Sequence, residues 1–96
     1  MTHLRQIFEF DPAKAASNLK RHGVSFNEAI TVFDDPLAST LPDDQHSIDE
    51  NRFISVGMSF KQRILFVVYT ETTSGIRLIG ARPATAAEIT QYEEVS

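Results

Sequence analysis

The stretch FEFDPAKAASNLKRHGVSFNEAITVFDDP, residues 8–36, decides most of the fold. Asp11 followed by Pro12 predicts a helix that begins at Pro12, because the first helical N–H group has no intrahelical partner and proline loses nothing by lacking it. Gly23 can adopt the left-handed conformation that closes a helix, so this first helix should end near His22.

A second helix is predicted directly after the first. Ser25 and Glu28 have the spacing of a capping box, in which the serine side chain reaches forward and the glutamate reaches back to backbone N–H groups. Asp34-Asp35-Pro36 should end this helix, because the residue before a proline avoids the helical conformation. One face of the helix is apolar and should pack on a core: Phe26, Ala29, Ile30 and Phe33.

The remainder of the chain reads as strands and one more helix. Turn-forming residues separate the expected strands, which span residues 7–10, 37–41, 52–60, 63–70 and 76–82. The last three are joined by short turns and should be antiparallel neighbours. Thr85 and Glu88 form a second capping box that opens a final helix. We therefore expect an α+β domain: an antiparallel sheet of four or five strands, with the N-terminal helix pair on one face and a C-terminal helix.

Two of the expected strands have distinct patterns. Residues 63–70 are almost all β-branched or aromatic, which indicates a central strand buried on both faces. Residues 52–60 alternate in character, which is typical of a strand covered mainly on one side. One face carries Ile54, Val56, Met58 and Phe60, and the other carries Phe53, Ser55, Gly57 and Ser59.

The composition restricts the kinds of protein that the chain can be. With 96 residues, of which 42% are hydrophobic, it should form one domain over residues 1–96. It has no cysteine, and therefore no disulfide, thiol nucleophile or cysteine-based zinc site. The longest apolar run, residues 64–69, is too short to span a bilayer, and MTHLRQIF lacks the apolar segment of a signal peptide. We expect a soluble, cytoplasmic protein that does not associate with membranes.

The charge is unevenly distributed along the chain. The formal net charge is −4, which argues against nucleic-acid binding if only the total is considered. Residues 51–82, however, carry five basic side chains and one acidic one, whereas residues 34–50 carry six acidic side chains and no basic one. This distribution is consistent with a basic surface on the strands, and equally with ordinary charge scatter on a small domain.

The first helix carries a polar cluster. Lys14, Asn18 and Arg21 lie at i, i+4 and i+7, and His22 borders them, while Ala15, Ala16 and Leu19 form the expected packing side. Such side chains can hold a phosphate and move a proton near neutral pH. Alternatively, they are a solvated face whose positive charges complement the negative end of the helix dipole.

The strands contribute four arginines: Arg52, Arg63, Arg77 and Arg82. Strict alternation would place Arg77 and Arg82 on opposite faces of the sheet, so a shared site requires a β-bulge between them. Gly80 is a natural position for that bulge. For any one of these arginines, the alternative is an exposed charge that protects a sheet edge.

Metal and covalent chemistry have little support in the sequence. His46, Asp49 and Glu50 match no standard metal-binding spacing. The four glycines are too dispersed for a phosphate-binding loop, and no serine lies in a nucleophile elbow. We therefore expect neither a metal nor a cofactor.

Several segments together resemble a known family. They are residues 8–36, RFISVG, RILFVVYTE, IRLIGARPAT and EITQYEE, in this order over nearly the whole chain. The chain resembles the BrnT-type toxins of bacterial type II toxin–antitoxin modules, small ribonucleases with a RelE-like fold. The resemblance implies metal-independent endonucleolytic cleavage of RNA that inhibits translation until an antitoxin binds.

The resemblance also implies site residues. A metal-free ribonuclease needs a base for the 2′-hydroxyl proton, cations for the charged phosphorane and an acid for the 5′-oxygen. Lys14, Arg52, Arg77 and Arg82 match basic positions of the family and would bind phosphate, His22 would transfer a proton, and Glu50 would act as a base. Asn18, Arg21 and Arg63 are further candidates for RNA binding.

The chain departs from the family pattern at two places. Ala86-Ala87 stand where arginines are common, and Gly80 stands where serine is frequent. The alternative function is therefore a weak or inactive toxin fold that acts mainly as an antitoxin-binding partner in transcriptional autoregulation. The partners implied are RNA and a BrnA-like antitoxin with a ribbon-helix-helix domain, with DNA contacted only through that antitoxin, in a higher-order toxin–antitoxin complex.

Overall fold

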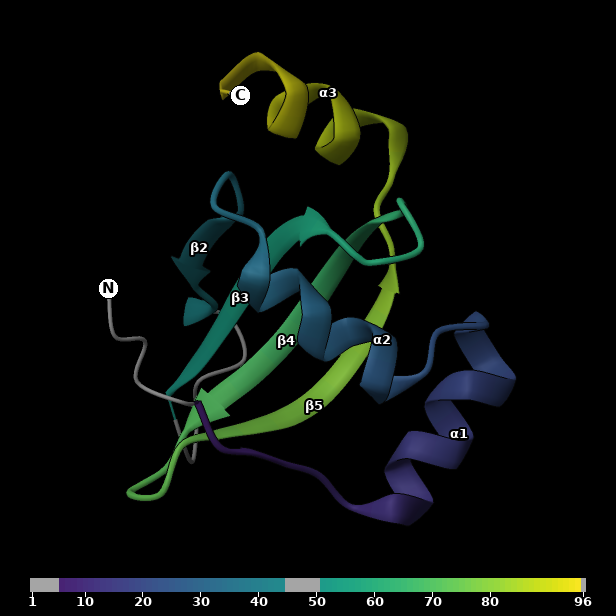
Figure 1. Cartoon of the computed structure of the whole chain (residues 1–96), viewed down its shortest axis with the longest axis vertical. Coiled ribbons are helices and arrows are strands. Elements are labelled where there is room, and N and C mark those ends of the chain that lie inside the picture. The colour runs from purple at the N-terminus through teal and green to yellow at the C-terminus, as the bar shows by residue number, and fades with distance from the viewer. Residues whose placement is uncertain (1–5, 45–50, 96) are drawn as a thin grey trace.

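A computed structural model describes residues 6–44 and 51–95 of the chain (Figure 1). The helices are α1 (Pro12–His22), α2 (Phe26–Ile30), the 3₁₀ helix η1 (Thr31–Asp34) and α3 (Ala86–Val95). The strands are β1 (Phe8–Glu9), β2 (Ser39–Pro42), β3 (Arg52–Met58), β4 (Ile64–Glu71) and β5 (Ile76–Pro83). The expected α+β class, with an N-terminal helix pair and a C-terminal helix, is confirmed.

The helix ends form as the sequence predicts. The Asp11 side chain accepts a hydrogen bond from the Ala13 N–H group at 2.9 Å. Gly23 has a φ of +69° and its N–H group bonds the Leu19 carbonyl, which closes α1. The second helix departs from the prediction, because α2 ends at Ile30 and the chain continues as η1, a tighter last turn.

The five strands form one sheet in the order β1-β5-β4-β3-β2. The three pairs from β2 to β5 are antiparallel, as expected. The expectation of a purely antiparallel sheet is wrong, because β1 pairs parallel to β5. The helix pair leads from β1 at one edge of the sheet to β2 at the other edge, so β1 and β5 are far apart in the chain and no short turn forces them to be antiparallel.

The core lies between the sheet and the helix pair. In Figure 1, α2 and η1 lie across one face of the sheet, α1 lies beside β5, and α3 extends beyond the end of the sheet. The buried apolar side chains come from both layers: Val24, Phe26, Ala29 and Val32 from the helical segment, and Leu65, Val67, Tyr69, Ile76, Leu78 and Ala81 from the strands. We call the opposite face of the sheet, away from α2 and η1, the open face.

The face of β3 that carries Ile54 and Val56 is not the face that packs against the helices. Its buried residues are the small ones, Ser55 and Gly57, which face the helices. A Cβ atom at Gly57 would lie 2.8 Å from the Cβ of Ala38 and 3.0 Å from a methyl group of Val32. The helical layer approaches so closely at Gly57 that a larger side chain does not fit there, and Ile54 and Val56 lie on the open face.

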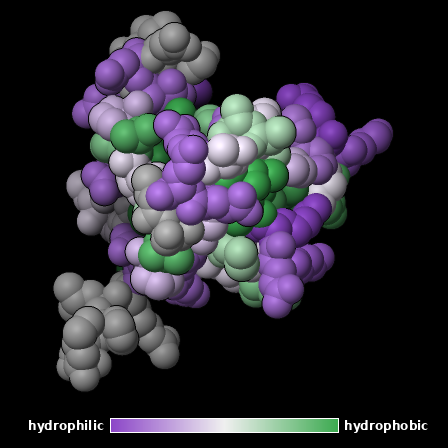
Figure 2. All heavy atoms as spheres, turned by 90° about the horizontal axis from the view of Figure 1, so that it is seen from above, coloured by the Kyte–Doolittle hydropathy of each residue, from purple (hydrophilic) through white to green (hydrophobic). Residues whose placement is uncertain are grey.

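The end of the molecule near α3 exposes both polar and apolar side chains. Seen from above in Figure 2, hydrophilic side chains cover much of this end, and hydrophobic ones are visible between them. Met58 and Phe60, at the end of β3 and in the turn after it, are 40% and 66% exposed.

Within the described residues, the chain has no helix long and apolar enough to cross a membrane.

Candidate nucleic-acid site on the open face

A β-bulge in β5 brings two arginines to the same face. Tyr69 of β4 pairs with Leu78, but the preceding residue Val68 pairs with Gly80, so Ile79 is an extra residue in the strand. This one-residue shift reverses the alternation between Arg77 and Arg82. Both lie in register with open-face residues of β4.

The first basic end of the open face combines two arginines with a hydroxyl group. Arg52, Thr70 and Arg77 lie directly opposite one another on β3, β4 and β5. Neighbouring strands are roughly 4.8 Å apart, so the two arginine backbones lie about 10 Å apart across Thr70. A recess of about 280 Å³ at this end is lined by Thr70, Thr72 and Arg77, and also by Asn51, Phe53 and Glu71, whose carboxylate opposes part of the positive charge. This end can accept an anion.

The second basic end is built around Arg82. Its guanidinium lies 3.9 Å from the centre of the Phe66 ring and donates to both oxygens of Glu88, at 2.9 and 3.0 Å. Planar stacking and a two-pronged bond fix the guanidinium in one orientation. Glu88 also exchanges the two capping-box bonds with Thr85, at 2.8 and 3.2 Å. The helix cap therefore orients the carboxylate toward Arg82.

The electrostatics of this pair favour charge on both groups. The hydrogen bond from Arg82 lowers the pKa of the Glu88 carboxyl, and the backbone N–H group of Thr85 adds to the effect, while partial burial opposes it. Glu88 is thus a carboxylate at neutral pH. It occupies the donors with which Arg82 would bind a phosphate.

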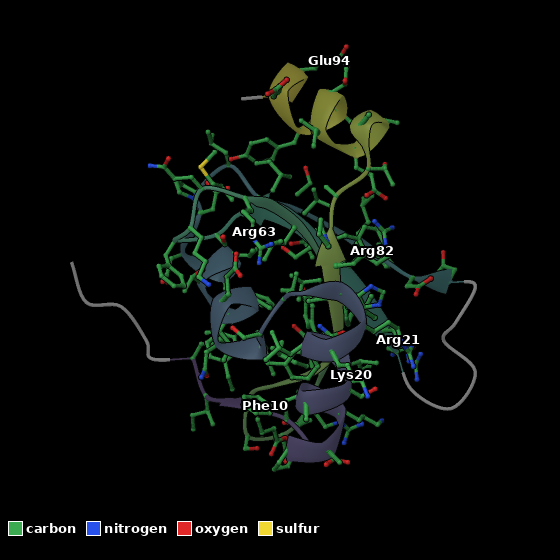
Figure 3. The ribbon with its side chains drawn as sticks, turned by 90° about the vertical axis from the view of Figure 1, so that its right-hand side faces the viewer. Phe10, Lys20, Arg21, Arg63, Arg82 and Glu94 are labelled. Carbon is green, nitrogen blue, oxygen red and sulfur yellow. The ribbon has the colours of Figure 1, made fainter. Side chains whose placement is uncertain are left out.

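The end of α1 joins this second basic end. The side-chain amide of Asn18 donates to the Ala81 carbonyl at 2.8 Å and accepts from the Ala81 N–H group at 3.1 Å. It therefore caps the part of the β5 edge that β1 does not cover. Arg21 lies one helical turn further along the same side of α1. In Figure 3, Arg21 and Arg82 extend to the same side of the molecule.

The surface between the two basic ends is apolar. Register places a continuous set of uncharged residues there: Leu41, Ile54, Val56, Phe66, Val68 and Gly80. Most of these are half-buried, and Leu41 is 63% exposed. The open face thus has the composition of a single-strand binding surface, with cations for phosphates and apolar groups for bases.

Two residues expected to bind RNA take part in structural hydrogen bonds. Asn18 also donates to the Val24 carbonyl at 2.9 Å, so its amide is used in joining α1 to the sheet. Arg63 forms an ion pair with Glu28, which is 1% exposed, and donates to the Gly23 carbonyl at 3.0 Å. Ser59 completes this cluster with a bond to Glu28 at 2.7 Å. These bonds connect the helix pair to the turn between β3 and β4.

Three further candidates lie outside the two basic ends. Lys14 is exposed in the first turn of α1, about 10 Å along the helix from Arg21. His22 is exposed at the C-terminal end of the same helix, next to Arg21. Glu50 lies outside the described residues, as do the other two members of the weak metal pattern. In the described part of the chain, no group of three metal-binding side chains occurs.

The sequence interpretation assigned Glu88 only to a helix cap and did not include it in the site. Its cap was predicted correctly, but the capping box gave no indication that the same carboxylate binds Arg82. The spacing of six residues across Pro83 is the available signal, because a strand end and the next helix start meet there. Phe66 belongs to the strand expected to be buried on both faces, and in the structure its ring lies against the Arg82 guanidinium.

The fold and the sequence both identify related proteins. A crystal structure of the ribonuclease toxin BrnT from Brucella abortus superposes with a TM-score of 0.65 and 20% identity, over 84% of this chain and 99% of that chain. At this identity, the match establishes a common fold. The sequence itself matches the family described as the ribonuclease toxin BrnT of type II toxin–antitoxin systems over residues 10–88. The chain therefore belongs to the BrnT family. No curated protein matches it.

Proposed function

We propose that this chain is an active endoribonuclease that cleaves RNA without a metal ion and thereby inhibits translation in the cytoplasm. The observation that carries the proposal is the β-bulge, which aligns Arg77 with Arg82 on one face of β5. Membership in a family of ribonuclease toxins supports the same activity. RNA would lie along the open face, with phosphates at the two basic ends and bases over the apolar surface between them.

The reaction proposed is attack of the ribose 2′-hydroxyl on the adjacent phosphorus. The phosphorus–O5′ bond breaks, and the products carry a 2′,3′-cyclic phosphate and a 5′-hydroxyl group. Arg82 binds the reacting phosphate, because its guanidinium is already fixed by Phe66. Arg52 and Arg77 hold a neighbouring phosphate, and Arg21 adds positive charge at the second basic end.

Glu88 is assigned as the base. Without RNA, its carboxylate occupies both donor groups of Arg82. A phosphate that takes this position removes the contact that lowers the pKa of Glu88, so the carboxylate becomes more basic as substrate binds. From the family resemblance, His22, which follows Arg21 at the end of α1, is assigned as the acid that protonates the 5′-oxygen. Lys14 and Glu50 remain as candidates from the family resemblance, for charge stabilisation and proton transfer.

A second candidate function has one observation in its favour. Glu88 already accepts hydrogen bonds from both terminal nitrogens of Arg82. The same arrangement is expected of a nuclease fold that has lost its activity. The protein would then act as an antitoxin-binding module in transcriptional autoregulation. Both functions require a DNA-binding antitoxin, and we propose a BrnA-like ribbon-helix-helix protein as that partner, with DNA contacted only through it in a higher-order complex.

Expression of the gene alone in a bacterial host distinguishes the two functions. The nuclease proposal predicts growth arrest and RNA cleavage on induction, and both should be lost in the double variant Arg77→Ala, Arg82→Ala. Normal growth and intact RNA with soluble, folded wild-type protein would support the inactive module instead. Co-expression of the neighbouring antitoxin gene should restore growth.

A further inference from the structure

A cavity of about 230 Å³ lies between α3 and the open face of the sheet. Its floor includes the apolar side chains of Leu41, Ile54 and Val56. One wall is the face of α3 that carries Gln91 and Tyr92. The floor is part of the apolar surface over which the bases of bound RNA are proposed to lie, and α3 encloses this part of it.

The position of α3 above the cavity is fixed by a buried hydrogen bond. Tyr92 is 7% exposed and donates its hydroxyl group to the Asp35 carboxylate at 2.6 Å. The same carboxylate accepts from the N–H group of Met58 at 2.8 Å. α3 therefore cannot move onto the apolar floor of the cavity without breaking the hydrogen bond between Tyr92 and Asp35. Ser39, the smallest lining side chain, leaves space at the edge strand β2.

The cavity is continuous with the second basic end. Glu88 lines it and also binds Arg82, at 2.9 and 3.0 Å. A nucleotide with its phosphate on Arg82 would therefore extend its base along the side of Glu88. The apolar floor suits the flat face of a base, and polar groups at the rim suit its edge.

The rim is rich in hydrogen-bond acceptors. The Oε1 atom of Glu88 accepts from Arg82 and from the Thr85 N–H group, whereas Oε2 accepts from Arg82 alone. A carboxylate oxygen can accept two bonds, so Oε2 has one position left. Gln91 is exposed, and its amide forms no hydrogen bond with the described part of the chain. The Glu88 oxygen can only accept, so it favours an exocyclic amino group over a uracil carbonyl, and the Gln91 amide presents a second acceptor beside an NH2 donor.

We propose that the cavity binds one unstacked nucleobase of the RNA, and that Glu88 and Gln91 select a base with an exocyclic amino group over uracil. The inference rests on the proposed function, because the RNA must lie on the open face. It adds a specificity site to the cleavage site.

The affinity of the purified full chain for short oligonucleotides tests the proposed nucleobase site. Hexamers of 2′-O-methyl adenosine, cytidine or uridine cannot undergo attack by the 2′-oxygen, and a hexamer of abasic 2′-O-methyl units supplies the backbone alone. Base binding in the cavity predicts roughly tenfold tighter binding of the adenosine and cytidine hexamers than of the abasic one. The uridine hexamer should have an intermediate affinity.

Two variants assign the difference to the cavity. Ser39→Trp on the exposed edge strand fills it and should reduce the advantage of the adenosine hexamer over the abasic one, while Gln91→Ala should bring adenosine and uridine closer together. Thr90→Trp and Thr90→Ala are the matched controls, because Thr90 is an exposed α3 residue outside the lining. Both should behave as wild type. Thermal unfolding checks that each variant is folded.

The outcomes separate this inference from the proposed function. Equal affinity of the wild type for the adenosine and abasic hexamers overturns the nucleobase site but leaves RNA backbone binding intact. The nucleobase site is also overturned if folded Ser39→Trp protein still binds the adenosine hexamer more tightly than the abasic one by the wild-type factor. If that variant instead loses antitoxin binding, the cavity receives a side chain of the antitoxin. If no oligonucleotide binds, the proposed function itself fails.

Discussion

Arg77 and Arg82 present their side chains to the same face of the sheet although they are five positions apart on one strand. Ile79, the extra residue of the β-bulge, accounts for this, because the register with β4 shifts by one between Leu78 and Gly80. A bulge beside a functional surface commonly redirects a side chain in this way. Here it joins two basic ends into one surface.

Removal of the Arg82 side chain should abolish most of the cleavage activity. Arg82→Ala removes both donor groups that would contact the phosphate, and we expect the rate to fall about a hundredfold or more. Arg82→Lys should recover little, because an ammonium group cannot replace the two-pronged geometry. Initial rates of RNA cleavage measure this, with Lys20→Ala as a control that removes one exposed positive charge from α1. Equal losses in the control would mean that net charge alone matters.

Substitution of Glu88 should affect binding and chemistry in opposite directions. Glu88→Gln keeps the shape but removes the charge that competes with phosphate for Arg82. We expect a lower KM for RNA together with a kcat reduced about a hundredfold, because the base is lost. A helix cap without other functions would leave both constants unchanged. The weakened cap should also lower the free energy of unfolding by about 1 kcal/mol.

Alkaline pH should weaken the attachment of α3. The hydrogen bond to Asp35 raises the pKa of Tyr92 to about 12, above its ordinary value near 10. The stabilisation is complete below pH 10 and is lost as pH rises toward 12, a change of roughly 3 kcal/mol. Urea unfolding at several pH values should therefore show that wild type and Tyr92→Phe converge at high pH. A constant difference across this range would contradict the assignment.

Acid should weaken the contact between the helix pair and the sheet. The hydrogen bond from Arg63 lowers the pKa of Glu28 despite its burial. Its contribution is complete above the unfolded pKa, near 4.3, and is lost as pH falls through the lower folded value. Glu28→Gln should cost about 2 kcal/mol at pH 7, less than a fully buried pair because the Arg63 side chain is 37% exposed. Urea unfolding should show this cost shrinking with acid, whereas exposed Glu94→Gln should have no effect.

Two glycine substitutions should differ sharply in stability. Gly57→Ala would place its Cβ 2.8 Å from the Cβ of Ala38, and we expect a loss of about 1–3 kcal/mol from overpacking. Gly80→Ala would place its Cβ 3.7 Å from the Asn18 side-chain oxygen, an ordinary contact. It should change the free energy of unfolding little. Denaturant titration compares them, and equal losses would contradict the close packing of β3.

The local signals in the sequence predicted most of the secondary structure. Asp11, Gly23, Ser25 and the box of Thr85 and Glu88 act within a few residues, and their hydrogen bonds form as expected. The Glu28 half of the first capping box does not form, because that carboxylate bonds Ser59 and Arg63 instead. The parallel pairing of β1 was not predicted, because a segment of four residues carries no information about the direction of a partner strand. The packing side of α1 was also wrong at Leu19, which is 51% exposed, since Asn18 occupies the contact with β5.

The site was less predictable than the fold. The need for a bulge between Arg77 and Arg82 was recognised from strand alternation, and the structure has one at Ile79. The structural roles of Asn18 and Arg63 depend on contacts across 63 and 35 residues, which no local pattern reveals. The pairing of Glu88 with Arg82 depends on the angle between β5 and α3, which is set by packing.

Cleavage of RNA by the purified protein tests the central claim most directly. We predict cleavage by the wild type in the presence of a chelator, with 2′,3′-cyclic phosphate ends on the fragments. The folded double variant Arg77→Ala, Arg82→Ala should leave the RNA intact. Intact RNA with the wild type, cleavage that requires added magnesium, or full activity in the double variant would contradict a metal-independent site on the open face.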